Sequence, residues 1–156
     1  MKSLVTTTIL ALGLTGGAAF AEGHADLTAT GDAAAGEKAF RQCVSCHVVQ
    51  NDDGETLAGR KSKTGPNLYQ VVGRAPGAVE GFRYGKDLAS LADSDLVYDE
   101  ATFVAYVQDP KGWLQEATDN SKARSKMSFK VRKEEDAINL YAYLKSLDPA
   151  MADATN

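Results

Sequence analysis

The stretch Cys43-Val44-Ser45-Cys46-His47 decides how the rest of the sequence is interpreted. Its two thiols are separated by two residues, about one helical turn, so both can reach the vinyl groups of a single macrocycle. The histidine follows at once and offers a ring nitrogen to the iron at the centre of such a ring. This spacing is typical of a c-type haem attachment site. We therefore expect Cys43 and Cys46 to form thioether bonds with one haem c, and His47 to bind its iron.

Two other uses of the cysteine pair compete with this interpretation. The pair is also compatible with a redox disulfide of the thioredoxin kind, or with half of a zinc site. Zinc requires two further ligands, but the chain has no other cysteine and only one other histidine, His24. A thioredoxin-like site lies in a strand-helix-strand setting, and the sequence shows no convincing strand. The haem interpretation fits the whole chain better than either alternative.

The N-terminus has the pattern of a secretory signal. Lys2 is the basic start, residues 4–14 form the apolar core, and Ala19-Phe20-Ala21 is a small-x-small cleavage site. We expect cleavage after Ala21 and export to the periplasm, an oxidising compartment. An uncleaved signal would instead tether the same domain to the membrane.

The remaining length and charge describe one small acidic domain. We expect a signal peptide over residues 1–21, a flexible leader over 22–30, one domain over 31–147 and a disordered tail over 148–156. The formal net charge of −4 argues against a general nucleic-acid binder. No cysteine is left for a structural disulfide, so a large apolar cofactor would have to complete the core of so small a domain. We therefore expect the haem-free chain to fold poorly.

Apolar spacing predicts an all-α fold. The first helix starts at Asp32, a plausible N-cap, and continues towards His47 with Gly36, Phe40 and Cys43 on one face. Further helices are expected over residues 100–107 and about 133–146, with a short one over 68–72. The other segments are expected to be loops: a polar one over 48–63, a second over 75–96, and a mobile polar insert over 115–126.

Met127 is the expected second iron ligand. Met1 is lost with the signal and Met151 lies in the tail. A lone methionine often fills a gap in a core, but Lys126 and Ser128 make the surroundings of Met127 polar. Ligation by histidine and methionine raises the reduction potential of a haem and fills both axial positions. Such a site passes single electrons and is not an enzyme; the alternative is a haem enzyme or gas sensor with a labile Met127.

Two residues are expected to tune or hold the cofactor. Pro66 has no N–H, and its carbonyl is free to accept a hydrogen bond from the outer ring nitrogen of His47, which would fix the tautomer of the ligand. Arg74 is a suitable partner for a buried haem propionate, because a guanidinium matches a carboxylate in shape and charge. The ordinary alternative for Arg74 is a solvated surface charge.

By these residues the sequence resembles the class I cytochromes c, and most of all the soluble cytochrome c2 type of bacterial periplasms. The resemblance covers about residues 31–147. It rests on the haem motif and on further motifs in this order: Gly65-Pro66-Asn67-Leu68, Gly73-Arg74, Gly81-Phe82-Arg83-Tyr84, Lys126-Met127-Ser128-Phe129 and Leu140-Tyr141-Ala142-Tyr143-Leu144-Lys145.

The resemblance implies a small fold in which crossed N- and C-terminal helices and further helices surround one haem. It implies that Arg74 and Tyr84 bind a propionate and that Tyr106 lies in the pocket near the Met127 sulfur. It also implies that Gly36 and Phe40 pack against Leu140 and Tyr143. Tyr98 stands where the family commonly has a tryptophan.

The charges around Met127 suggest a docking surface. Six basic residues flank it with no acid between them: Lys122, Arg124, Lys126, Lys130, Arg132 and Lys133. A run of this kind is usually only a solvated face, but here it borders the expected haem edge and would steer the protein onto acidic partners. By resemblance, a monomer would take electrons from a cytochrome bc complex. It would pass them to a terminal oxidase, a photosynthetic reaction centre or a denitrification enzyme.

Overall fold

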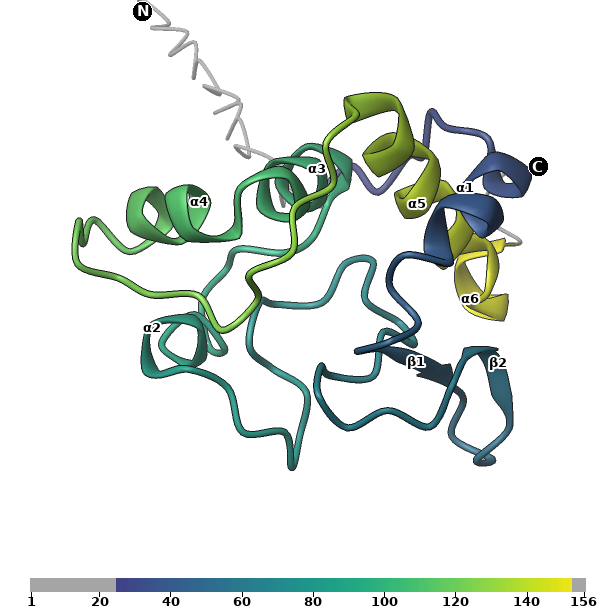
Figure 1. Cartoon of the computed structure of the whole chain (residues 1–156), viewed down its shortest axis with the longest axis horizontal. Helices are drawn as coiled ribbons and strands as arrows, with labels where there is room; N and C mark the ends of the chain where they lie inside the picture. Colours follow the sequence, from purple (N-terminus) through teal and green to yellow (C-terminus); the bar gives the residue numbers. More distant parts are fainter. Residues whose placement is uncertain (1–24, 153–156) are drawn as a thin grey trace, which may run out of the picture.

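The computed structural model describes residues 25–152 of the chain. The expected signal peptide, its cleavage site after Ala21 and His24 lie outside these residues. Figure 1 shows α1 (Ala33–Phe40) beside α5 (Glu134–Ser146), with α3 (Glu100–Gln108) near α5 and α4 (Pro110–Ala117) beyond α3. The short helices α2 (Lys86–Ala89) and α6 (Pro149–Ala152) complete the helical part. None of the helices described combines the length and apolar character that a membrane crossing requires.

The first helix begins where its cap predicts. The Asp32 carboxylate accepts hydrogen bonds from the backbone N–H groups of Ala34 and Ala35, at 2.7 and 3.2 Å, and thereby satisfies two free donors of the first turn. The sequence predicts that this helix continues towards His47, but the helix ends at Phe40. Backbone bonds three residues apart, such as Cys43 N–H to Phe40 O at 2.8 Å, tighten the chain there into turns.

The crossing of α1 and α5 depends on the absence of a side chain at Gly36. A Cβ there would overlap the Asn139 carbonyl oxygen and would lie 2.6 Å from Cβ of Tyr143. The Phe40 and Tyr143 rings pack with their centroids 5.6 Å apart. The implied contact between the first and last helices is confirmed, and its reason is close approach of the two backbones.

The helical fold class is confirmed, with one local difference from the predicted loops. The segment expected as a polar loop over residues 48–63 contains an antiparallel hairpin of β1 (Val48–Gln50) and β2 (Thr56–Gly59). In its register Val49 pairs with Ala58. Strands of three and four residues are too short to show an alternating pattern, so the sequence reasoning missed them.

Three other expectations are also corrected by the structure. The short helix expected over residues 68–72 is a series of turns, because Gln70 has a left-handed φ of 55°, which a right-handed helix does not accommodate. The loop expected over 75–96 contains α2. The insert over 115–126 begins inside α4, and within it Ala123 is fully buried. Ala123 joins Leu91 and Leu114 in a small second core.

The two ends of the described chain make more contacts than the sequence predicts. The backbone N–H and hydroxyl of Thr30 both donate to the Glu100 carboxylate, at 2.6 and 2.7 Å. Leu27 packs against the main core. At the other end Asp148 is buried and α6 follows it.

Candidate functional site

A large cavity of about 1020 Å³ lies between the end of α1, the hairpin, α3, α5 and the loops. All eight residues that the sequence singled out line this one cavity: Cys43, Cys46, His47, Pro66, Arg74, Tyr84, Tyr106 and Met127. They come from segments more than 80 positions apart in the chain. The fold therefore brings together what the sequence only placed in separate motifs.

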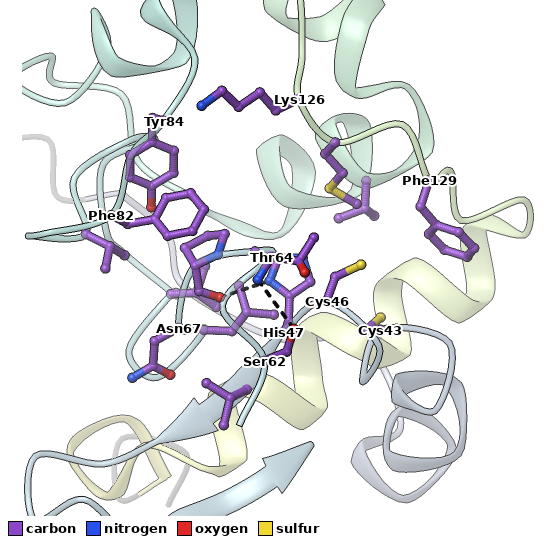
Figure 2. Close-up of a pocket in the computed structure, with 18 of the residues that line it drawn as sticks. Cys43, Cys46, His47, Ser62, Thr64, Asn67, Phe82, Tyr84, Lys126 and Phe129 are labelled. Carbon is purple, nitrogen blue, oxygen red and sulfur yellow. Dashed lines mark hydrogen bonds between the residues drawn. The ribbon is translucent and has the colours of Figure 1, made fainter. Parts of the chain in front are cut away.

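The two cysteines and the histidine stand on one wall of the cavity (Figure 2), while Lys126 and Phe129 come from the segment across it. Burial raises the pKa of the Cys43 thiol to about 11, and the neighbouring Cys46 adds to that rise. Cys43 is therefore a neutral thiol at pH 7 in the polypeptide. Within the described residues no group of three or more His, Cys, Asp or Glu side chains is arranged to hold a metal ion, which leaves the zinc interpretation without its further ligands.

The tautomer of His47 follows from its hydrogen bond. Its Nδ1 lies 2.9 Å from the carbonyl oxygen of Pro66 (dashed in Figure 2), and a carbonyl oxygen only accepts, so Nδ1 carries the proton. Burial lowers the pKa of His47, and the bond to Pro66 opposes that change only in part. The ring is accordingly neutral at pH 7, with its lone pair on Nε2, as a metal ligand requires.

The loop that carries Pro66 is held by a residue that the sequence reasoning quoted but gave no role. The Asn67 side chain accepts a hydrogen bond from Gln50 N–H at 3.0 Å and donates to Gln50 O at 2.7 Å, which ties the loop to β1. Gly65 allows the loop to pass over His47, because a Cβ there would lie 2.6 Å from Nδ1. We call this pair of hydrogen bonds the Asn67 clamp. Its only signal in the sequence is an Asn that follows Gly-Pro.

Arg74 lies mostly buried beside the cavity. Its Nη1 donates to the Tyr69 carbonyl at 2.7 Å and its Nη2 to the Asn67 carbonyl at 3.1 Å. Burial lowers its pKa, with Tyr84 and Tyr98 as the nearby groups that favour the charge. In the described residues no carboxylate forms an ion pair with it. An arginine that is buried without an acidic partner fits a site whose missing anion comes from the cofactor.

The tyrosines complete the wall around Arg74. Tyr98 is only 8% exposed, and its ring packs against those of Tyr106 and Trp113 with centroids 5.6 and 6.3 Å apart. Burial raises the pKa of Tyr98 and of Tyr106, so both remain neutral hydroxyls. A flat apolar ring with two acidic arms fits this cavity, because its walls are largely apolar and the guanidinium of Arg74 lies beside it.

The cavity also has basic residues that the sequence reasoning did not single out. Lys61, Lys63 and Arg83 line it together with Arg124 and Lys126. The sequence contains the basic run Arg60-Lys61-Ser62-Lys63, but this run is far from Met127 along the chain. The sequence therefore did not predict that both line one cavity. The positive charge at the cavity therefore comes from three separate segments and not only from the Met127 segment.

Comparison with known proteins agrees with this geometry. No family model matches the chain. Cytochrome c2 of Rhodovulum adriaticum is 59% identical over 118 residues, which cover 76% of this chain and 94% of that protein. The chain belongs to the cytochrome c2 family. Cytochrome c-550 of Paracoccus versutus is 46% identical over 121 residues, covering 76% of this chain and 77% of that protein.

The fold of the cytochrome c2 family is also the fold of this chain. A solved structure of cytochrome c2 from Rhodobacter sphaeroides superposes with a TM-score of 0.72 at 51% identity, covering 74% of this chain and 95% of that one. Membership brings the cofactor with it: one haem c, bound covalently through Cys43 and Cys46. It also makes the chain an electron carrier. The thioredoxin-like alternative is excluded by the same finding.

Proposed function

We propose that the chain carries single electrons through a haem c whose iron is held by His47 and Met127. The haem supplies the one-electron chemistry when it is bound. His47 offers Nε2, since Nδ1 is engaged by Pro66 at 2.9 Å. Of the methionines in residues 25–152, Met127 lines the cavity and Met151, on α6, does not. The observation that carries the proposal is the presence of both donor side chains in one apolar cavity.

The other cavity residues would hold the cofactor and exclude water. Arg74 would bind a propionate in the guanidinium geometry that its two carbonyl contacts fix, and Tyr84 would donate to the same group. Tyr106 and Val107, both buried on α3, would close the Met127 side against solvent. A soft neutral thioether in such an apolar site raises the reduction potential.

The basic residues around the cavity would guide transient docking. Lys122, Arg124, Lys126, Lys130, Arg132 and Lys133, with Lys61, Lys63 and Arg83 added by the structure, would form a positive face around the haem edge. A cytochrome bc complex would be the donor. A terminal oxidase, photosynthetic reaction centre or denitrification enzyme would be the acceptor. The site of action would be the periplasm, after cleavage of the signal at Ala21.

The ligand assignment is tested by the absorption spectrum of the purified holoprotein. Ligation by methionine gives the ferric protein a weak charge-transfer band in the red and prevents ready binding of carbon monoxide to the ferrous protein. Met127→Ala is expected to abolish the band and admit carbon monoxide, whereas Met151→Ala, the matched control, is expected to change neither. A parent protein that binds carbon monoxide readily would instead support a haem enzyme or gas sensor with a labile Met127.

The docking surface is tested by charge reversal at a residue without a structural role. Lys126 and Lys130 are poor choices because they contact the Arg83 carbonyl at 2.7 Å and Asp109 at 2.8 Å. Lys63→Glu, at a residue that lines the cavity, is expected to slow electron delivery several-fold at low salt, with the difference lost at high salt. Lys38→Glu on α1 makes the same charge change away from the cavity. Equal rates for the two variants would remove the docking proposal.

A further inference from the structure

The chain segment just before Met127 lies against the segment around α2. The backbone N–H of Arg124 donates to Oδ2 of Asp87 at 3.0 Å, and Nζ of Lys126 donates to the carbonyl oxygen of Arg83 at 2.7 Å. Between these bonds Gly85 faces both residues: a Cβ there would lie 3.7 Å from the Arg124 carbonyl oxygen and 3.6 Å from Cγ of Lys126. Two stretches about 40 positions apart in the sequence are thus joined side by side (compare α2 and the green segment beside it in Figure 1).

The second core stabilises the junction between the α2 region and the segment before Met127. Ala123, directly before Arg124, is fully buried with Leu114 of α4 and Leu91, which follows α2. The Gln115 side chain donates to the carbonyl oxygens of Ser121 and Ala123, at 2.7 and 3.4 Å. The insert therefore reaches Arg124 in a defined conformation.

A separate anchor holds the chain after Met127. Val131 is 2% exposed, and its backbone N–H donates to the Val107 carbonyl of α3 at 2.9 Å. Lys130 pairs with Asp109 at 2.8 Å. Between the anchors at Arg124 and Val131 the segment lines the cavity, and the Met127 N–H donates to Ser125 Oγ at 3.1 Å. The two flanking anchors therefore fix where this cavity-lining segment begins and ends.

We propose that Asp87 is a positioning residue for the sulfur of Met127: its carboxylate, by accepting the Arg124 N–H, fixes the N-terminal anchor of the ligand segment. The inference rests on the proposed ligation by Met127. A charged acceptor makes this the stronger type of hydrogen bond. Asp87 does not line the cavity and so acts on the ligand only through Arg124. Loss of this bond favours the conformations in which Met127 leaves the iron.

The test measures how easily Met127 is displaced in the ferric holoprotein. Imidazole is titrated while the red charge-transfer band is followed. Asp87→Ala is expected to lower the dissociation constant for imidazole roughly tenfold, the equivalent of one net hydrogen bond. Asp87→Asn, which keeps an acceptor oxygen, is expected to stay within about threefold of the parent. Asp93→Ala is the matched control, since Asp93 is an exposed acid just after α2 with the same charge.

The outcomes separate this inference from the proposal on which it rests. If the parent has no methionine-dependent band, the ligation by Met127 fails and the role of Asp87 fails with it. If the parent has the band but Asp87→Ala binds imidazole like Asp93→Ala, only the role of Asp87 is overturned, even where denaturation shows a less stable fold. Should Asp87→Ala not yield folded protein, hydrogen exchange of the parent decides. The Arg124 amide must then exchange more slowly than the Lys126 amide, and equal rates overturn the proposal.

Discussion

The crossing of α1 and α5 and the segment around Met127 both border the haem cavity, but different interactions hold them. At the crossing, Gly36 brings two helix backbones together, and Leu140 and Tyr141 are almost fully buried beside it. Around Met127 the chain has no helix or strand and is fixed at its two ends, near Arg124 and Val131. At the crossing the contacts that hold the helices come from the polypeptide itself, whereas the Met127 segment lines the cavity of about 1020 Å³ along most of its length.

The two regions differ in how much change they tolerate. A segment that is held at its ends can be adjusted by a few contacts, whereas a tightly packed helix crossing tolerates little change. Regions with few buried apolar contacts also open more easily than the core does. The two regions should therefore respond differently to substitution.

The largest effect is expected when haem attachment is prevented. In a Cys43→Ala, Cys46→Ala double variant the walls of the cavity lose their partner, and a domain with a net stability of about 5–15 kcal/mol does not tolerate such a loss. We expect no cooperative unfolding transition in circular dichroism, with any remaining amide protection confined to α1 and α5. A cooperative transition, with amide protection around Met127 equal to that of the parent protein, would show that the Met127 segment does not depend on the haem.

Gly36→Ala tests the crossing of α1 and α5. The added methyl group would overlap the Asn139 backbone, so we expect a loss of about 3 kcal/mol or more in the free energy of unfolding, measured by guanidinium denaturation. Gly54→Ala is the control: its Cβ would meet nothing within 4 Å, and only its φ of +80° costs energy, about 1 kcal/mol. Equal losses would mean that the helices separate easily.

Glu100→Ala releases the N-terminal segment from α3. Thr30 would lose two exposed hydrogen bonds to the carboxylate, so we expect a loss of about 1 kcal/mol in the free energy of unfolding. The imidazole affinity of the ferric protein should not change, because the contact does not involve the Met127 segment. Glu116→Ala, an exposed acid on α4, serves as the control. A change in imidazole affinity would couple the two sides.

Gln70→Gly is expected to have the smallest effect, and to stabilise. Gln70 has a φ of 55°, in the left-handed region that glycine adopts without strain, and its side chain is exposed. Relief of that strain exceeds the extra chain entropy of glycine by about 0.5 kcal/mol. Denaturation should show a slight gain, and a loss would mean that the Gln70 side chain contributes contacts of its own.

Sequence reasoning reached most of the cavity because its chemistry is local. The haem motif is five consecutive residues, the cap at Asp32 acts within one helical turn, and Pro66 reveals its role by lacking an N–H. Met127 followed from counting the few candidate ligands. These signals require only knowledge of neighbouring residues.

What the sequence by itself determined, then, is the cofactor and the two cysteines that attach it, because covalent attachment requires particular side chains at a particular spacing. The tertiary structure alone decided the hairpin, the Asn67 clamp, the second core and the contact of Asp87 with Arg124. The physical reason is range. Each of these features joins short, weakly patterned segments, and most join stretches far apart in the chain. Their energies come from contacts that exist only once the chain has folded.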